Sequence, residues 1–250
     1  MLRKKSLGQC FMEDKNILRL EADAAGKLDG KIVLEIGPGD GRLSEILLSK
    51  KPKKLYLVEK DSRFAQALQD KFANDKEIVQ IIEGDILEIE FPEVEIVFGN
   101  IPYYISSEII FGLKDKKIEK AILMVQKEFA KKMVQKHGEG NYGRLSVTSQ
   151  IFFQTKILKS VPNHLFRPMP QVDSAIIELI PTHEKVSIEY EDIIRFLYQH
   201  KNKTVRNALL DSKKYTKEEI GKIGDYALKR AKTLNKKEVL EICNLLTSKK

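Results

Sequence analysis

Short apolar runs alternate with helical patterns in the first half of the chain, and this alternation restricts the possible folds more than any other feature. Five runs have the composition of buried strands, at residues 31–36, 54–59, 79–83, 94–98 and 121–125. A helical pattern follows the first run, with apolar residues at Leu43, Ile46 and Leu47, and a second follows the next run. Strands that are apolar along their whole length are typical of parallel sheets covered by helices on both faces. The sequence therefore predicts an α/β fold built on a parallel sheet.

Two further strands are expected at residues 154–161 and 174–180. The segment between them contains Pro162, Pro168 and Pro170 and has no helical pattern that could form a crossover. Strands joined without a crossover pair as an antiparallel hairpin. We therefore expect a sheet of seven strands that is mostly parallel and contains one antiparallel strand.

The pattern changes at Pro181-Thr182-His183, after which it is helical throughout. This change predicts a first domain over residues 1–180 and a small all-helical domain over residues 181–250. The formal net charge is +8, and residues 181–250 hold 16 Lys and Arg against 10 Asp and Glu. A basic region beside a balanced domain is typical of proteins that bind a polyanion such as a nucleic acid. The alternative is a lysine-rich surface that is only solvated.

Composition argues against several other classes of protein. No apolar run approaches the roughly 20 residues that span a bilayer, and the basic N-terminus lacks the apolar core of a signal peptide. Cys10 and Cys243 have no metal-binding spacing and offer no disulfide framework. We therefore expect a cytoplasmic protein without a metal site, and the lack of a long heptad pattern predicts a monomer.

A glycine-rich loop, Glu35-Ile36-Gly37-Pro38-Gly39-Asp40-Gly41, follows the first predicted strand. Glycines at this place let a ligand approach the backbone closely. Glu59 ends the second strand, 20 residues after Gly39, where an acidic side chain commonly accepts ribose hydroxyls. Asp85 follows the third strand and is placed to bind an adenine amine, although it could also be a simple turn residue. The spacing Gly-x-Gly-x-Gly differs from that of dinucleotide sites and favours a nucleoside without a pyrophosphate, such as S-adenosylmethionine.

The tetrapeptide Asn100-Ile101-Pro102-Tyr103 follows the fourth apolar run. The amide oxygen of Asn100 and a carbonyl of the stiff proline turn can accept the two N–H bonds of an exocyclic amine on a flat ring. These contacts localise a nitrogen lone pair that is otherwise spread into the ring, so the nitrogen becomes a better nucleophile. The ring of Tyr103 can stack on the flat base. The alternative is an ordinary Asn-Pro turn after a strand.

With these features in order, the chain resembles the ribosomal RNA adenine N6,N6-dimethyltransferases over nearly its whole length. The resemblance is carried by the glycine-rich loop and by residues 8–12, 100–106, 142–146, 166–174 and 200–207. It implies a Rossmann-like class I methyltransferase fold with a helical C-terminal domain, and S-adenosylmethionine as the cofactor. It implies methylation of N6 on two adjacent adenines near the 3′ end of small-subunit ribosomal RNA, within an immature subunit, as a step of ribosome biogenesis.

The resemblance also assigns roles to single residues. The implied catalytic residues are Asn100, Pro102, Tyr103 and Phe166, with Phe166 on the second face of the adenine. The implied cofactor contacts are Gln9, Cys10, Met12, Gly37, Gly39, Glu59, Asp85 and Asn100. The implied RNA contacts are Arg3, Lys4, Lys5, Arg144, Lys201, Lys203 and Arg206. Cys10 stands where the family often has Asn or His: a contact through its backbone would be unaffected, whereas a contact through its side chain would lose hydrogen-bond strength. Met12 stands where Leu is usual, which is a conservative apolar change.

Three other functions compete with this interpretation. A resistance-type methylase of large-subunit RNA would share the tetrapeptide chemistry, but residues 200–207 favour the small-subunit enzyme. A non-catalytic ribosome assembly factor could keep the fold, but the presence of Gly37, Glu59, Asp85 and Asn100 argues for activity. A DNA adenine methylase typically begins the tetrapeptide with an acid, which Asn100 is not.

Overall fold

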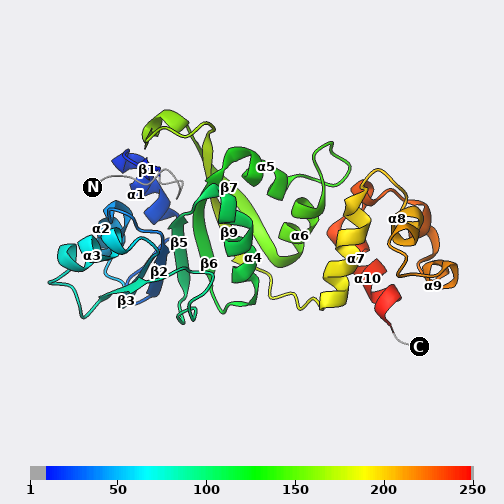
Figure 1. Ribbon diagram of the computed structural model, residues 1–250, viewed down its shortest axis with the longest axis horizontal. Coiled ribbons are helices and arrows are strands. Elements are labelled where there is room, and N and C mark those ends of the chain that lie inside the picture. Colours follow the sequence, from blue (N-terminus) through cyan, green and yellow to red (C-terminus); the bar gives the residue numbers. More distant parts are fainter. Residues whose placement is uncertain (1–9, 249–250) are drawn as a thin grey trace. The chain divides into compact units, whose positions relative to one another are not determined.

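The computed structural model describes residues 10–248 of the chain, which form two compact units. The first contains residues up to Ala130 together with Gln154–Pro181, and the second contains Lys131–Phe153 together with the chain from Thr182 onward. The chain therefore passes from one unit to the other three times. In Figure 1 the blue, cyan and part of the green ribbon belong to the first unit, and the yellow to red helices belong to the second.

A seven-stranded sheet forms the centre of the first unit, in the order β4-β3-β2-β5-β6-β9-β7 (Figure 1). Its strands are β2 (Ile32–Ile36), β3 (Lys54–Glu59), β4 (Val79–Glu83), β5 (Ile96–Asn100), β6 (Lys120–Gln126), β7 (Phe153–Val161) and β9 (Ser174–Pro181). The strands from β2 to β6 pair in parallel, and β9 runs antiparallel to β6. The predicted α/β fold, with seven strands and one antiparallel strand, is confirmed.

Helices cover both faces of this sheet. Val33 and Leu34 are neighbours on β2, so their side chains point to opposite faces, yet both are fully buried. The helices are α1 (Lys15–Ala24), α2 (Arg42–Ser49), α3 (Ser62–Lys71), α4 (Ser106–Gly112) and α5 (Lys127–Val134), and α5 spans the first passage between the units. Short 3-10 turns lie at Tyr103–Ile105, Leu113–Asp115 and Asn163–Leu165. A separate two-stranded pair joins β1 (Phe11–Met12) to β8 (Phe166–Arg167).

The second unit is helical. It contains α6 (Arg144–Phe152), α7 (Ile188–Gln199), α8 (Val205–Asp211), α9 (Lys217–Gly221) and α10 (Lys236–Thr247), with 3-10 turns at Gly224–Leu228 and Ala231–Thr233. Tyr142, just before α6, is fully buried, and its ring meets that of Tyr198 on α7 edge to face at 6.0 Å. The segment around α6 is thus part of the core of this unit. Among the described residues, no helix has the length and apolar composition needed to cross a bilayer.

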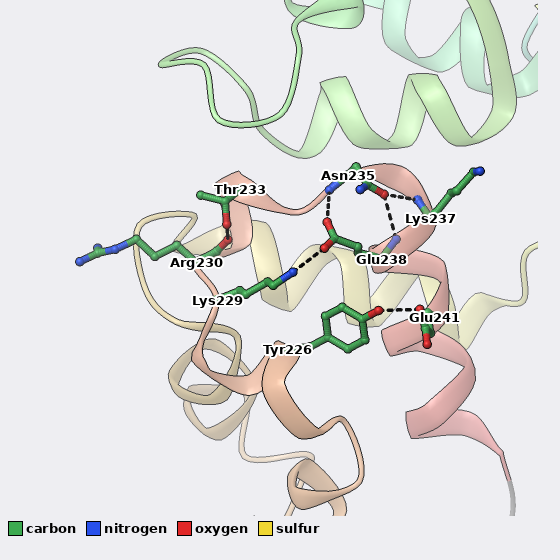
Figure 2. Close-up of polar contacts among 8 residues, drawn as sticks. All are labelled: Tyr226, Lys229, Arg230, Thr233, Asn235, Lys237, Glu238 and Glu241. Carbon is green, nitrogen blue, oxygen red and sulfur yellow. Dashed lines mark hydrogen bonds and ion pairs between the residues drawn. The ribbon is translucent and has the colours of Figure 1, made fainter.

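A polar network fixes the start of α10 (Figure 2). The Asn235 side chain accepts hydrogen bonds from the backbone N–H groups of Lys237 and Glu238 at 2.9 and 3.1 Å, and Glu238 returns one by accepting from the Asn235 N–H at 2.8 Å. Lys229 then donates to the other oxygen of Glu238 at 2.6 Å. This capping box ties the chain before α10 to the helix. The ion pair with Glu238 also neutralises the charge of Lys229.

Candidate cofactor and base site

A cavity in the first unit opens where β2, β3, β4 and β5 end. Parallel strands bring their carboxyl ends to one edge of a sheet, where ligands bind in doubly wound folds. The cavity is lined by every described residue that the sequence analysis assigned to the cofactor or to catalysis: Cys10, Met12, Gly37, Gly39, Glu59, Asp85, Asn100, Pro102, Tyr103 and Phe166. Gln9 lies outside the described residues. The topology thus brings together residues that are spread over more than half of the chain.

The glycine-rich loop needs its glycines for two different reasons. Gly37, Gly39 and Gly41 all have positive φ values, of 67°, 57° and 76°, which side chains with a Cβ rarely adopt. Gly39 is also crowded, since a Cβ placed there would lie 2.5 Å from Cε1 of Phe11. The Phe11 ring in turn packs against Phe64, with the ring centres 5.4 Å apart. The absence of a side chain at position 39 therefore lets Phe11 form one wall of the cavity.

Glu59 joins the end of β3 to the glycine-rich loop. One carboxylate oxygen accepts the Gly39 N–H at 3.0 Å, and the other accepts the Asp61 N–H at 2.9 Å. The residue is only 7% exposed, and this burial raises the pKa of the carboxyl while the backbone donors act in the opposite direction. Each oxygen still has a lone pair available, which is what a contact with ribose hydroxyls requires.

Glu35, at the end of β2, is a second buried acid in the cavity wall. The Ser44 hydroxyl donates to its carboxylate at 2.6 Å. Burial raises the pKa of Glu35 to about 8, and the Ser44 hydrogen bond offsets only part of this effect. The nearby carboxylates of Glu59 and Asp40 raise the pKa further.

Asp85, which follows β4, is an acid of the cavity wall that pairs with a lysine. Its carboxylate accepts from the Lys60 ammonium at 2.6 Å and from the Leu87 N–H at 3.0 Å. The hydrogen bond from Lys60 lowers the pKa of Asp85. A carboxylate has about four acceptor positions, so Asp85 can still accept a hydrogen bond from an adenine amine.

Asn100 is the last residue of β5, and its amide contacts an acid that the sequence analysis did not identify. In the orientation that matches donors with acceptors, the Asn100 amide nitrogen lies 3.0 and 3.2 Å from the two carboxylate oxygens of Glu21. Glu21 is on α1 and is fully buried. A signal for it was present in the sequence, because Glu21 follows Ile17 by four residues and so lies on the apolar face of the helix.

Pro102 and Tyr103 form the turn after Asn100. The Pro102 carbonyl already accepts from the Ile105 N–H and the Ser106 hydroxyl, both at 3.2 Å. The Tyr103 hydroxyl forms a 2.7 Å hydrogen bond with the Ser174 hydroxyl, and the residue is half-buried. The structure therefore fixes the Tyr103 ring at the cavity wall, whereas an amine that reached Pro102 would have to displace the Ser106 hydroxyl.

Phe166 and Met12 are more deeply packed than a direct ligand contact would suggest. They are paired across β1 and β8 and are 3% and 4% exposed. Both belong to the hydrophobic core and also touch the cavity. Cys10 is half-buried in the same wall.

Some of the residues predicted to contact RNA form contacts within the protein, whereas others are exposed. The Lys201 ammonium donates to the carbonyls of Gly140 and Tyr142 at 2.8 and 3.1 Å, and Lys203 pairs with Asp211 at 2.5 Å. Arg144, the first residue of α6, and Arg206, on α8, are exposed. Arg3, Lys4 and Lys5 lie outside the described residues. Lys201 therefore holds a loop of its own unit together, a role that the sequence analysis missed.

The fold and this site define a Rossmann-like methyltransferase. A profile of the family "Ribosomal RNA adenine dimethylase" matches residues 2–250. The chain belongs to this family, whose methyl donor is S-adenosylmethionine, and the predicted family and cofactor are confirmed.

Two relatives carry the name "Probable ribosomal RNA small subunit methyltransferase A". The protein from Thermococcus gammatolerans is 37% identical over 245 residues, which cover 95% of this chain and 87% of the relative. The protein from Pyrococcus furiosus is 40% identical over 212 residues, which cover 84% and 76%.

Two solved structures resemble the whole chain. A dimethyladenosine transferase from Plasmodium falciparum has a TM-score of 0.82 at 27% identity, covering 93% of this chain and 95% of its own. The 23S rRNA methyltransferase ErmE has a TM-score of 0.70 at 27% identity, covering 94% and 99%.

Gly39→Ala should weaken S-adenosylmethionine binding and destabilise the fold. The added Cβ would push Phe11 out of the cavity wall, at a cost of about 1–3 kcal/mol from overpacking, in addition to about 1–2 kcal/mol for the left-handed backbone. Calorimetric titration and urea unfolding measure the two effects. The matched control is Gly26→Ala, where φ is +82° but the new Cβ has open space around it. This variant should lose only the free energy of unfolding that comes from the left-handed backbone. Equal losses in the two variants would contradict the proposed role of Phe11.

Glu35→Gln should make the free energy of unfolding less dependent on pH between about 4.5 and 8. Because the pKa of Glu35 is raised from 4.5 to about 8 in the folded protein, the native state holds a proton that the unfolded state has lost. This group therefore removes stability as pH rises between these two values, by up to about 1.4 kcal/mol per pH unit. Urea unfolding from pH 5 to 9 should show a less negative slope for Glu35→Gln, whereas Glu108→Gln, at an exposed position on α4, should keep the wild-type slope. An unchanged slope for Glu35→Gln would contradict the raised pKa.

Proposed function

We propose that this protein methylates N6 of two adjacent adenines near the 3′ end of small-subunit ribosomal RNA, as a monomer acting on immature subunits in the cytoplasm. One observation carries the proposal: Asn100 and Tyr103 line the same cavity as Gly37, Glu59 and Asp85. A methyl donor and a base can therefore meet in one pocket. The relatives named for the small-subunit methyltransferase, at 37–40% identity, support the choice of RNA.

The donors and acceptors of the cavity fit S-adenosylmethionine. Glu59 offers acceptors for the ribose hydroxyls, Asp85 offers acceptors for the adenine amine, and the glycine-rich loop exposes backbone close to the ligand. When bound, the cofactor supplies an already activated methyl group, so the protein's task is positioning and desolvation.

The target adenine leaves its stack to reach the cavity, as bases do in enzymes that modify them. Tyr103, held by Ser174, stacks on one face, and Phe166 covers the other. Such stacking contributes about 1–3 kcal/mol per base. Phe166 is only 3% exposed, but it lines the cavity and can therefore meet the base there.

Asn100 is the main acceptor for the N6 amine. Its amide oxygen takes one N–H bond, and the Pro102 carbonyl takes the second after the Ser106 hydroxyl turns away. The adenine nitrogen gains a methyl group and releases one proton to solvent in each transfer. The second transfer needs the same pocket to admit N-methyladenine and a fresh methyl donor.

The helical unit, including the basic chain after residue 181, binds the RNA backbone. Its net charge over residues 181–250 is +6, and the exposed arginines Arg144 and Arg206 are the best placed of the predicted contacts to reach phosphate. The basic residues 3–5 are proposed to act in the same way.

A second candidate function is methylation of large-subunit RNA, because the 23S rRNA methyltransferase ErmE resembles the chain over 94% of its length. The two functions differ in substrate, not in chemistry.

The test is mass spectrometry of nucleosides from unmethylated small and large subunits after incubation with protein and S-adenosylmethionine. We expect N6,N6-dimethyladenosine in the small-subunit RNA only. Product in large-subunit RNA alone would favour the second candidate.

Asn100→Ala should abolish methyl transfer in this assay and leave the fold intact, because it removes the acceptor for the reacting amine. Loss of at least about 100-fold is expected for a group that acts in the transition state. Circular dichroism and cofactor titration serve as controls for folding and binding. Turnover near the wild-type rate would show that Asn100 does not perform this role.

Arg206→Ala and Lys201→Ala should distinguish a residue that binds RNA from one that stabilises the fold. Loss of a phosphate contact at Arg206 should lower the salt slope of RNA binding by about one without changing stability. Lys201→Ala should instead destabilise the protein by about 1–3 kcal/mol, since the carbonyl of the buried Tyr142 loses a charged donor, and the carbonyl of the exposed Gly140 loses one as well. Filter binding at several salt concentrations and urea unfolding test the pair, and the reverse pattern would contradict the assignment.

A further inference from the structure

Of the described residues that line the cofactor cavity, two carry a basic side chain, Arg42 and Lys60. S-adenosylmethionine has a carboxylate at the end of its amino-acid tail. A carboxylate that leaves water for a protein site needs a cation or hydrogen-bond donors to replace its hydration. In the proposed site Asp85 and Glu59 serve the adenine and the ribose, so the carboxylate of the tail requires a partner of its own.

Lys60 lies at the adenine end of the site. Its ammonium pairs with the Asp85 carboxylate at 2.6 Å, and Asp85 follows β4. The neighbouring strand β3 ends at Glu59, and β2 and β5 come next in the sheet. A ligand with its adenine on Asp85 and its ribose on Glu59 therefore extends from β4 across β3 toward β2 and β5. Its amino-acid tail lies away from Lys60.

Arg42 stands on the side of the cavity that the tail reaches. It is the first residue of α2, directly after the glycine-rich loop that follows β2. Its Nε lies 3.0 Å from a carboxylate oxygen of Asp40, and its Nη1 donates to the Met12 carbonyl at 3.4 Å. Met12 belongs to β1 and also lines the cavity. The guanidinium is therefore held between the glycine-rich loop and β1.

These two contacts leave the guanidinium able to bind an anion. The group is planar and carries several N–H donors in a fixed fork, of which the contacts with Asp40 and Met12 use one each. The remaining donors can form the paired hydrogen bonds that a guanidinium gives to a carboxylate. The Arg42 side chain is 39% exposed, so a ligand can reach it. Neighbouring Glu35 opposes an anion little at neutral pH, because burial raises the pKa of its carboxyl to about 8.

We propose that Arg42 binds the carboxylate of the cofactor's amino-acid tail. This inference rests on the proposed function, in which Asp85 takes the adenine and Glu59 the ribose. The bond from Arg42 to the Met12 carbonyl then places the end of the tail beside β1. Arg42 contributes to cofactor affinity and touches neither the reacting methyl group nor the RNA.

Two ligands that differ only in the carboxylate test the proposal: S-adenosylmethionine and its decarboxylated form. Calorimetric titration without RNA measures both affinities. Arg42→Met keeps much of the apolar length of the side chain and removes its charge. It should weaken S-adenosylmethionine about 10- to 100-fold, as expected for hydrogen bonds between charged groups. The affinity for the decarboxylated form should not fall by more than about twofold.

Arg42→Lys keeps the charge and loses the fork of donors. It should weaken S-adenosylmethionine by an intermediate factor of about 3 to 10, since an ammonium replaces the paired contact with a single point charge, and it should spare the decarboxylated form. Urea unfolding shows whether each variant is folded. If Arg42→Met does not fold, the result with Arg42→Lys decides, and an unchanged ratio of the two affinities in that variant would overturn the proposal.

Lys60→Met is the matched control, because it removes a positive charge from the opposite end of the same cavity. Any loss of affinity in this variant should be the same for both ligands within about twofold, since the decarboxylated form keeps the adenine. A fall in the affinity ratio as large as that of Arg42→Met would mean that total charge, and not a contact with Arg42, selects the carboxylate. That result would overturn the proposal.

The remaining outcomes distinguish this inference from the function on which it rests. If Arg42→Met weakens both ligands equally, the residue only holds β1 against the glycine-rich loop, and the proposal is overturned. It is overturned as well if neither affinity changes. If Asp85→Ala leaves both affinities at their wild-type values, the proposed placement of the adenine fails instead. Methyl transfer to RNA is measured separately, so its absence would not alter the meaning of these titrations.

Discussion

The parallel pairing of β2 with β3 and β5 is the constraint on which the rest of the structure depends. In this register Ile36 lies beside Val58 and Gly99, so the loops that follow the three strands leave the sheet at one edge. Glu59 strengthens the arrangement, because its carboxylate holds the backbone of the glycine-rich loop at Gly39. The cavity is therefore a consequence of strand order, and its chemistry depends on which side chains stand at the strand ends.

The site concentrates buried acids, and their presence is better explained by function than by stability. Glu21, Glu35 and Glu59 are all less than 10% exposed, and burial disfavours the ionised form of each. Each is compensated by a different donor: the Asn100 amide, the Ser44 hydroxyl and two backbone N–H groups. Replacing such groups by apolar ones is often neutral for stability. Glu59 instead holds the glycine-rich loop at Gly39, and Glu21 contacts the Asn100 amide.

Much of the fold could be predicted from the sequence, because its signals are local. The predicted strand at residues 54–59 matches β3, and the predicted strand at 154–161 differs from β7 by one residue. The glycine-rich loop and the tetrapeptide at Asn100 were also recognisable, since their chemistry depends on residues close together in the chain.

What the sequence could not show depends on contacts between distant segments. Glu21 is 79 residues before Asn100, and only the packing of α1 brings them together. The bonds from Lys201 to the loop at residues 140–142 depend in the same way on how the helical unit folds. The depth at which Phe166 is buried follows from its pairing with Met12 across β1 and β8. Periodicity and motif spacing carry no information on such contacts.

The central claim is that one cavity holds the methyl donor against the Asn100–Tyr103 edge. A crystal structure of the protein with S-adenosylhomocysteine would test it most directly. The account predicts the ribose hydroxyls on Glu59, the adenine amine on Asp85, and the sulfur facing the amide oxygen of Asn100. A ligand bound elsewhere, or one whose sulfur points away from Asn100, would contradict it.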